Sequence, residues 1–206
     1  MNYAPQVDKT HYEGRAYRSL ERWSSYWHQL AFVRANAPKT VLEVGVGEGV
    51  VATTLRGSGV TVTTVDVAAD LNPDVIASIT KLPFGDHSFD TVLAAEVLEH
   101  ISFEDVPTAL RELARVGKWV VISLPHPGYV FSFVCKLPML PTIEIFFQIP
   151  FLWQHHTFNG EHYWELGKRG YSVRRFITVA RDAGLHLDRY ARYADDPGHR
   201  YFIFSS

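Results

Sequence analysis

Short apolar runs alternate with helix-like patterns along the first two thirds of the chain. Four compact runs rich in β-branched residues are typical of strands buried on both faces of a parallel sheet. These runs are residues 41–46, 60–67, 91–95 and 119–124. Helical patterns, such as 50–56 and 104–116, separate most of them. Because this alternation is the sequence form of βαβ units, we predict an α/β domain with a mostly parallel sheet.

The two ends of the chain complete this arrangement. Residues 15–37 place aromatic and aliphatic side chains at helical spacing before Pro38, which predicts an amphipathic N-terminal cover helix. Residues 172–183 predict a helix that ends at Gly184. Two strand-like runs follow, 186–193 and 200–204, and they predict an antiparallel pair that closes the sheet. The segment 66–75 contains Asn72-Pro73, so we expect a turn there in place of a full helix.

Residues 126–170 do not follow the pattern of the sheet. The part from 129 to 153 is almost wholly apolar and aromatic, with three prolines and few polar residues. It is too interrupted for a membrane-spanning helix. We interpret 126–170 as an inserted aromatic substrate lid, and a dimer interface or a membrane-contacting surface remain alternatives.

Length and composition limit the class of protein. With 206 residues, the chain is long enough for one domain, and we assign 1–206 to it. A net charge of −2 argues against a surface built to hold nucleic acid. Cys135 is the only cysteine, which excludes a disulfide framework and a thiolate metal cluster. The first 22 residues lack the apolar core of a signal peptide, so we expect a cytoplasmic protein with no transmembrane segment.

The most informative segment is Val41-Leu-Glu-Val-Gly-Val-Gly-Glu-Gly49. It predicts a buried strand that breaks into a tight turn at a helix N-terminus, where backbone N–H groups face a ligand. The glycines of this turn are Gly45, Gly47 and Gly49. Val50 occupies the place of the third glycine of the dinucleotide fingerprint, which argues against an oxidoreductase.

A second segment, Leu82-Pro-Phe-Gly-Asp-His-Ser-Phe-Asp90, leads into the run 91–95. Together with Glu43-x-Gly-x-Gly-x-Gly49, it resembles class I S-adenosylmethionine-dependent methyltransferases of the type 11-like group, over roughly residues 40–125. The resemblance implies a Rossmann-like fold with helices on both faces of the sheet. It also implies S-adenosylmethionine as the cofactor.

Cofactor contacts follow from this resemblance, position by position. Asp66 ends the second strand, where a carboxylate can accept hydrogen bonds from a ribose diol. Val67 would cover one face of the adenine, and Ser78 with the Ile79 backbone would contact the ring. Glu43 would orient the ammonium group of the cofactor, although a buried carboxylate satisfied by the glycine turn is an equal interpretation.

The candidate reaction centre is Glu96-Val-Leu-Glu-His100, directly after the run 91–95. His100 is a candidate general base, and His126 is an alternative. The segment is also similar to metal-assisted O-methyltransferases of small RNAs and of the ubiquinone pathway, in which a later histidine completes a cation site. That similarity implies Mg²⁺ or Mn²⁺ on Glu96, Glu99, His100 and His162, with His155 or His156 as substitutes for His162.

Aromatic residues of the N-terminal helix and of the insertion could form the wall of an acceptor pocket. They are Trp23, Tyr26, Trp27, Phe131, Phe133, Phe146, Phe147, Phe151 and Trp153. A basic cluster, Lys168, Arg169, Arg174 and Arg175, could meet an acidic group of the acceptor or could be a solvated surface.

The sequence therefore predicts an S-adenosylmethionine-dependent methyltransferase that O-methylates a small, partly apolar acceptor, with a homodimer possible through the apolar insertion. One alternative is a metal-dependent RNA 2′-O-methyltransferase. The other is a non-catalytic protein that binds S-adenosylmethionine without turnover.

Overall fold

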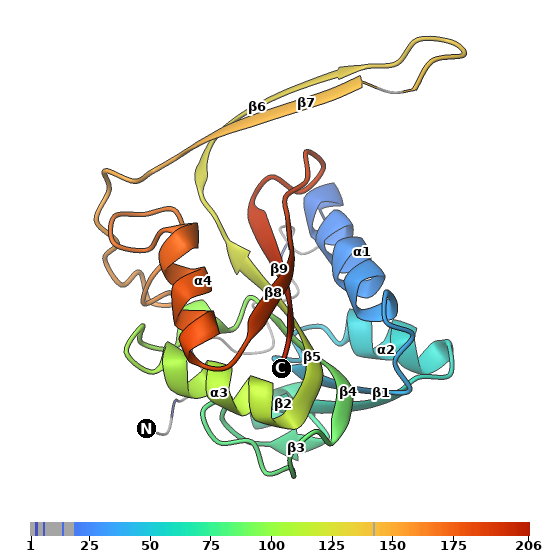
Figure 1. Ribbon diagram of the computed structural model, residues 1–206, viewed down its shortest axis with the longest axis vertical. Helices are drawn as coiled ribbons and strands as arrows, with labels where there is room; N and C mark the ends of the chain where they lie inside the picture. The colour runs from blue at the N-terminus through green and yellow to red at the C-terminus, as the bar shows by residue number, and fades with distance from the viewer. Residues whose placement is uncertain (1–2, 4–5, 7–13, 15–18, 142) are drawn as a thin grey trace.

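The computed structural model describes residues 3, 6, 14, 19–141 and 143–206. Its main sheet has seven strands in the order β3-β2-β1-β4-β5-β9-β8 (Figure 1). The strands are β1 (Thr40–Val44), β2 (Thr61–Asp66), β3 (Val75–Ile76), β4 (Phe89–Ala95), β5 (Gly117–Pro125), β8 (His186–Ala191) and β9 (His199–Ser205). The first five pair in parallel, whereas β9 runs antiparallel to both β5 and β8. The predicted mixed sheet is confirmed.

Four α-helices cover the two faces of this sheet (Figure 1). They are α1 (Leu20–Arg34), α2 (Val50–Gly57), α3 (Val106–Val116) and α4 (Val173–Asp182). On one face, Val33 of α1 and Leu55 of α2 belong to one buried apolar cluster. On the other face, Leu110 of α3 and Phe176 of α4 belong to a second cluster. Helices on both faces explain why the central strands are apolar on both sides.

The connection from β2 to β4 contains no α-helix, as expected from the turn predicted in 66–75. Only the 3₁₀ turn η3 (Ala69–Leu71) and the two-residue strand β3 lie in it. β3 escaped prediction because two residues are too few to show a pattern. The cover helix is confirmed from Leu20 onward, whereas residues 15–18 lie outside the described part of the chain.

Within the insertion, residues 128–150 form a separate two-stranded antiparallel hairpin that projects from the body of the molecule (Figure 1), whereas Trp164 and Leu166 belong to the core of the body. Its strands are β6 (Gly128–Cys135) and β7 (Ile143–Pro150). The sequence did not predict a hairpin here, because apolar residues occupy both alternating sets of positions and hide the period of two. In the described part of the chain, no helix is long and apolar enough to cross a membrane.

Candidate functional site

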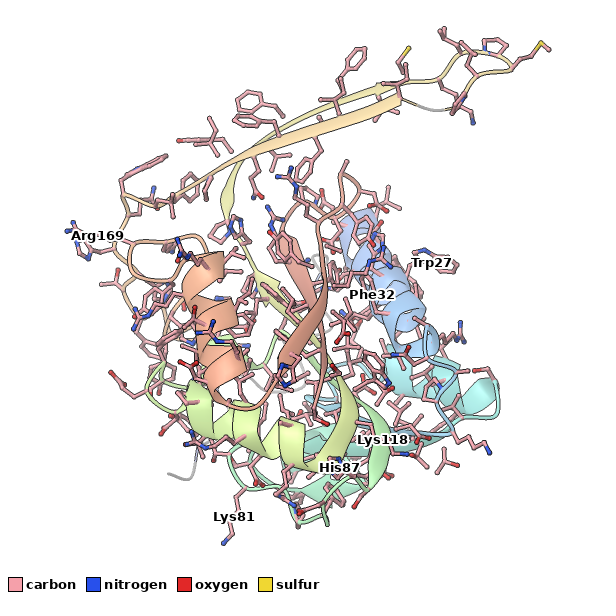
Figure 2. All side chains as sticks on the ribbon, viewed as in Figure 1. Trp27, Phe32, Lys81, His87, Lys118 and Arg169 are labelled. Carbon is pink, nitrogen blue, oxygen red and sulfur yellow. The ribbon has the colours of Figure 1, made fainter. Side chains whose placement is uncertain are left out.

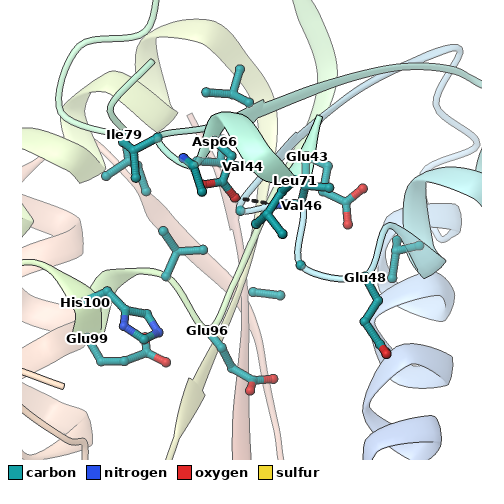
Figure 3. Close-up of a pocket in the computed structure, with 18 of the residues that line it drawn as sticks. Glu43, Val44, Val46, Glu48, Asp66, Leu71, Ile79, Glu96, Glu99 and His100 are labelled. Carbon is teal, nitrogen blue, oxygen red and sulfur yellow. Dashed lines mark hydrogen bonds between the residues drawn. The ribbon is translucent and has the colours of Figure 1, made fainter. Parts of the chain in front are cut away.

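A pocket of about 540 Å³ opens at the carboxyl ends of β1, β2 and β4 (Figure 3). In open α/β sheets this edge is the usual place for ligands. All eight residues predicted to contact the cofactor line the pocket. They are Glu43, Gly45, Gly47, Gly49, Asp66, Val67, Ser78 and Ile79. The pocket size falls within the usual range for a small-molecule or cofactor site.

The glycine turn has the backbone conformation that the sequence predicted. Gly45, Gly47 and Gly49 have φ values of 84°, 51° and 70°, which L side chains rarely adopt. Gly45 is also sterically constrained, because a Cβ there would lie 2.4 Å from Cγ2 of Val97. The missing side chain therefore lets the loop after β4 approach the glycine turn closely.

Asp66 connects two parts of the pocket. Its Oδ2 accepts a hydrogen bond from the Val46 N–H at 2.9 Å (Figure 3), and its Oδ1 accepts one from the Ala68 N–H at 2.9 Å. Each carboxylate oxygen can accept more than one hydrogen bond. Asp66 can therefore hold the glycine turn in place and still accept bonds from a ribose diol.

The predicted adenine end lies around the segment after β3. Val67, Ser78 and Ile79 line the pocket together with Leu71. The hydroxyl of Ser78 lies 2.9 Å from that of Thr80, so Ser78 is already held by its neighbour. This end combines apolar walls with few polar side chains, as a planar ring requires.

Glu43 is buried at the end of β1, with one carboxylate oxygen lacking a hydrogen-bond partner among the described residues. Burial raises the pKa of Glu43 to about 8, despite a hydrogen bond from the Ala52 backbone. The spare oxygen can accept a bond from a cationic ligand group at the pocket wall. Both interpretations of Glu43, structural anchor and cofactor contact, remain compatible with this geometry.

Glu96 belongs to an ion-pair cluster that the sequence did not reveal. Its Oε2 lies 2.8 Å from Nη1 of Arg22 on α1, and its Oε1 lies 3.4 Å from Nε2 of His199 on β9. Nδ1 of His199 in turn lies 2.6 Å from Oδ1 of Asp196. Burial alone would raise the pKa of Glu96, but the charges of His199 and Arg22 outweigh burial and lower it. These partners are distant in sequence, so no local motif could have indicated them.

Glu99, His100 and His162 converge at the pocket, each with one possible ligand atom within 4.8 Å of the others. Burial raises the pKa of Glu99 to about 8, and neither of its carboxylate oxygens has a hydrogen-bond partner among the described residues. Three of the four predicted metal ligands therefore meet. Glu96, the fourth, is held by Arg22 and His199 instead.

Neighbouring oxygen atoms orient both imidazoles of this cluster. Nδ1 of His100 lies 3.1 Å from the carbonyl oxygen of Glu161 and 2.7 Å from Oε1 of Gln6. Nδ1 of His162 lies 3.0 Å from Oε1 of Glu165. Because these partners are acceptors, we assign a proton to Nδ1 in each ring. Nε2 of His100 then has a free lone pair, whereas the hydrogen bond to Glu165 and the nearby Glu99 outweigh burial and raise the pKa of His162. Metal-binding histidines are commonly held in this manner.

The other histidines lie in different positions. His126 is buried against Gly167, and a Cβ atom added to Gly167 would lie 2.7 Å from Nε2 of His126. His126 does not line the pocket. Burial and the nearby Arg200 lower the pKa of His126 to about 4. His155 lies beside Arg169, and His156 lies 2.8 Å from the His162 carbonyl oxygen. None of the three histidines belongs to the cluster, and the interpretation of His126 as a base is not supported.

The predicted aromatic wall is not assembled around the pocket. Tyr26 lines it, and the hydroxyl of Tyr26 donates a hydrogen bond to Glu48 in the glycine turn at 2.9 Å. Trp27 is 64% exposed on α1 and points away from the body of the molecule (Figure 2). The hairpin aromatics do not line the pocket, because the strands that carry them project from the body (Figures 1 and 2). Among the described residues between 126 and 170, Glu161 and His162 alone line it.

A glycine turn, a strand-end carboxylate and a pocket at the carboxyl edge of the sheet are the arrangement with which α/β folds commonly bind nucleoside cofactors. Residues 42–119 match the model of the family described as methyltransferase domain. That segment contains the glycine turn, Asp66 and the Glu96–His100 segment. The match over this segment, together with the Rossmann-like fold, supports a class I S-adenosylmethionine-dependent methyltransferase.

Solved structures show the same fold. In the Haloferax volcanii complex of the Trm112 methyltransferase activator with a methyltransferase, the similarity has a TM-score of 0.62 at 16% identity and covers 97% of both chains. The CcbJ methyltransferase from Streptomyces caelestis is similar with a TM-score of 0.59 at 15% identity, over 88% of this chain and 89% of that chain. The N-methyltransferase NodS from Bradyrhizobium japonicum, solved with S-adenosylhomocysteine, is similar with a TM-score of 0.58 at 14% identity, over 90% of this chain and 87% of that chain. No curated protein sequence is significantly similar to this chain.

Proposed function

We propose that the chain transfers the methyl group of S-adenosylmethionine to a hydroxyl of a small, partly apolar acceptor. The single observation that carries this proposal is the convergence of Glu99, His100 and His162 at the pocket. A hydroxyl is a weak nucleophile, and it needs a base or a cation at its oxygen to accept a methyl group. A cluster with a free imidazole nitrogen and an unpaired carboxylate meets that need. The net charge of −2 supports a small molecule over RNA.

The cofactor would lie between the glycine turn and Asp66, with its ribose on Asp66 and its adenine beside Val67, Ser78 and Ile79. The loop after β4 would then bring Glu99 and His100 to the end of the pocket that receives the acceptor. Alignment of donor and acceptor supplies most of the acceleration in a displacement of this kind. The close contact between Gly45 and Val97 supports such an alignment, because it fixes the two loops against each other.

The cluster suits Mg²⁺ or Mn²⁺, because a carboxylate with two oriented imidazoles offers hard and borderline ligands and leaves positions for substrate oxygens. Glu99, His100 and His162 would hold the ion, and Glu165 would orient His162. A bound cation would supply positive charge that lowers the pKa of the acceptor hydroxyl.

Without a cation, His100 is the candidate base. Burial and the nearby His162 lower the pKa of His100, so its imidazole is neutral at physiological pH. With its proton on Nδ1, the ring can use Nε2 to take the proton of the acceptor hydroxyl. Glu161 supports this role, because its carbonyl oxygen fixes the tautomer.

Calorimetric titration of Mn²⁺ into the protein saturated with S-adenosylhomocysteine tests the cluster. We expect saturable binding that the His162→Ala variant loses and that the matched His155→Ala variant keeps. Loss in both variants, or retention in both, would contradict the assignment of His162. If the wild-type protein binds no Mn²⁺, His100 is the base, and methyl transfer to phenols or catechols should persist in EDTA.

A further inference from the structure

The β6–β7 hairpin has one face that is entirely apolar. Residues that lie opposite each other in an antiparallel pair project from the same face. The register pairs Tyr129 with Ile149, Phe131 with Phe147, Phe133 with Ile145, and Cys135 with Ile143. We call these eight residues the outer face; it contains no charged or amide side chain.

The opposite face points toward the body of the protein. Gln148 is buried, and its Nε2 donates a hydrogen bond to the carbonyl oxygen of His126 at 2.8 Å. The guanidinium groups of Arg192 and Arg200 lie 5.5 and 5.9 Å from the ring centre of Phe146. These contacts hold the face that carries Phe146 and Gln148 against the body, so the outer face points away from it.

The outer face is as large as one side of a stable protein interface. Phe131, Phe133 and Phe147 are 58–60% exposed, and Ile145 is 58% exposed. Since an aromatic side chain can bury on the order of 200 Å², the eight residues present roughly 800 Å² of apolar surface. A standard interface buries about 800 Å² per partner, and exposed patches above about 600 Å² are unusual on monomers.

Lipid is a poor occupant for this hairpin. Insertion into a bilayer would leave the backbone groups along both strand edges without partners. Between residues 128 and 150 the charged residues are Lys136 and Glu144, so the hairpin has no net positive charge to attract anionic lipids.

We propose that the occupant is a second copy of this chain, with the two outer faces packed against each other about a two-fold axis. A uniformly apolar face is self-complementary, as an isologous interface requires. Two ribbons packed face to face form a small sandwich with its strand edges in water, so the backbone groups that oppose membrane insertion stay solvated. The proposal concerns the hairpin alone and does not depend on the proposed methyl acceptor.

Light scattering coupled to size-exclusion chromatography, on the full chain at micromolar concentration, tests the second copy. We expect a mass of twice 23.4 kDa. The variant Phe131→Ser/Phe147→Ser alters one of the two central pairs of the outer face and should raise the dissociation constant by about 100-fold or more, giving a monomer. The control variant Ile76→Ser alters a residue that is 63% exposed on the edge strand β3, and it should stay dimeric.

A monomeric wild-type protein, or a double variant that remains dimeric, would overturn the proposal. So would a monomer that floats with vesicles of phosphatidylcholine and phosphatidylglycerol and loses this binding in the double variant. If the double variant lacks the circular-dichroism spectrum of the folded protein, the single Phe133→Ser variant makes the same test at the neighbouring cross-strand pair.

Discussion

Gly45 is the point where the glycine turn meets the loop that carries the candidate reaction centre, so an added methyl group there should disturb both stability and cofactor binding. Its φ of 84° and the 2.4 Å approach of Val97 are two separate penalties. A left-handed alanine costs about 1–2 kcal/mol. An overlap that displaces a packed side chain adds about 1–3 kcal/mol.

Gly59 provides a matched control for the first penalty. It has a φ of 86°, and a Cβ there would meet no atom within 4 Å. We therefore expect Gly59→Ala to lower the free energy of unfolding by about 1–2 kcal/mol, and Gly45→Ala to lower it by about 2–5 kcal/mol, the sum of both penalties. The added difference should largely disappear in the double variant Gly45→Ala/Val97→Ala.

Urea unfolding with an unchanged m-value measures these free energies. Calorimetry with S-adenosylhomocysteine should show weaker binding to Gly45→Ala and unchanged binding to Gly59→Ala. Equal destabilisation by the two alanines would refute the argument that Val97 limits the space at Gly45. Unchanged cofactor affinity in Gly45→Ala would refute the placement of the cofactor on this turn.

Three further predictions concern charged groups of the pocket. Because burial raises the pKa of Glu43 to about 8, the unfolded chain releases this proton at lower pH than the folded protein. Glu43 should therefore make the free energy of unfolding fall between about pH 4.5 and pH 8. Urea midpoints should fall less steeply with pH in Glu43→Gln, and a slope equal to that of the wild-type protein would contradict the raised pKa. Glu96→Ala removes the carboxylate that Arg22 and His199 share. Since a hydrogen bond to a charged group contributes about 1.5–3 kcal/mol, the free energy of unfolding should fall by about that amount. A loss below about 0.5 kcal/mol in urea titrations would show that the cluster is not coupled. Asp66→Asn keeps one acceptor oxygen, so it should weaken S-adenosylhomocysteine binding about tenfold, whereas Asp66→Ala should weaken it by about 100-fold or more. Equal calorimetric affinities of the wild-type protein and both variants would exclude a ribose contact at Asp66.

The fold was largely predictable, because its signals are local. The strands from β1 to β5, apart from the two-residue β3, are short apolar runs, and the glycine turn follows β1 within a few residues. The predicted cofactor residues line one pocket because the carboxyl ends of parallel strands meet at the same edge of the sheet. Such an inference needs only the order of the strands.

The reaction centre was only partly predictable. Glu99 and His100 are neighbours on one 3₁₀ turn, but Arg22 and His199 reach Glu96 from segments 74 and 103 positions away in the sequence. Tertiary packing decides such contacts, and a single sequence carries no trace of them. Glu96 therefore matched the metal motif in sequence while its carboxylate pairs with other groups in the structure.

The hairpin was missed for a different reason. The positions of Phe131 and Phe133 alternate with those of Val130 and Val134, which are also apolar, so the sequence does not show which set faces outward. Gln148 and the Phe146 contacts decide the orientation, and both depend on the body of the protein. The sequence indicated an unusual apolar insertion, and the structure supplied its shape.

Methyl transfer itself is the most direct test of the central claim. Tritiated S-adenosylmethionine should be incubated with catechol, phenol and methyl glucoside, using the wild-type protein and the variants Glu99→Gln and His162→Ala. We expect the wild-type protein to label at least one of these hydroxyl compounds, and both variants to lose the activity while binding S-adenosylhomocysteine with unchanged affinity. Full activity in both variants would contradict the role of this cluster in the reaction.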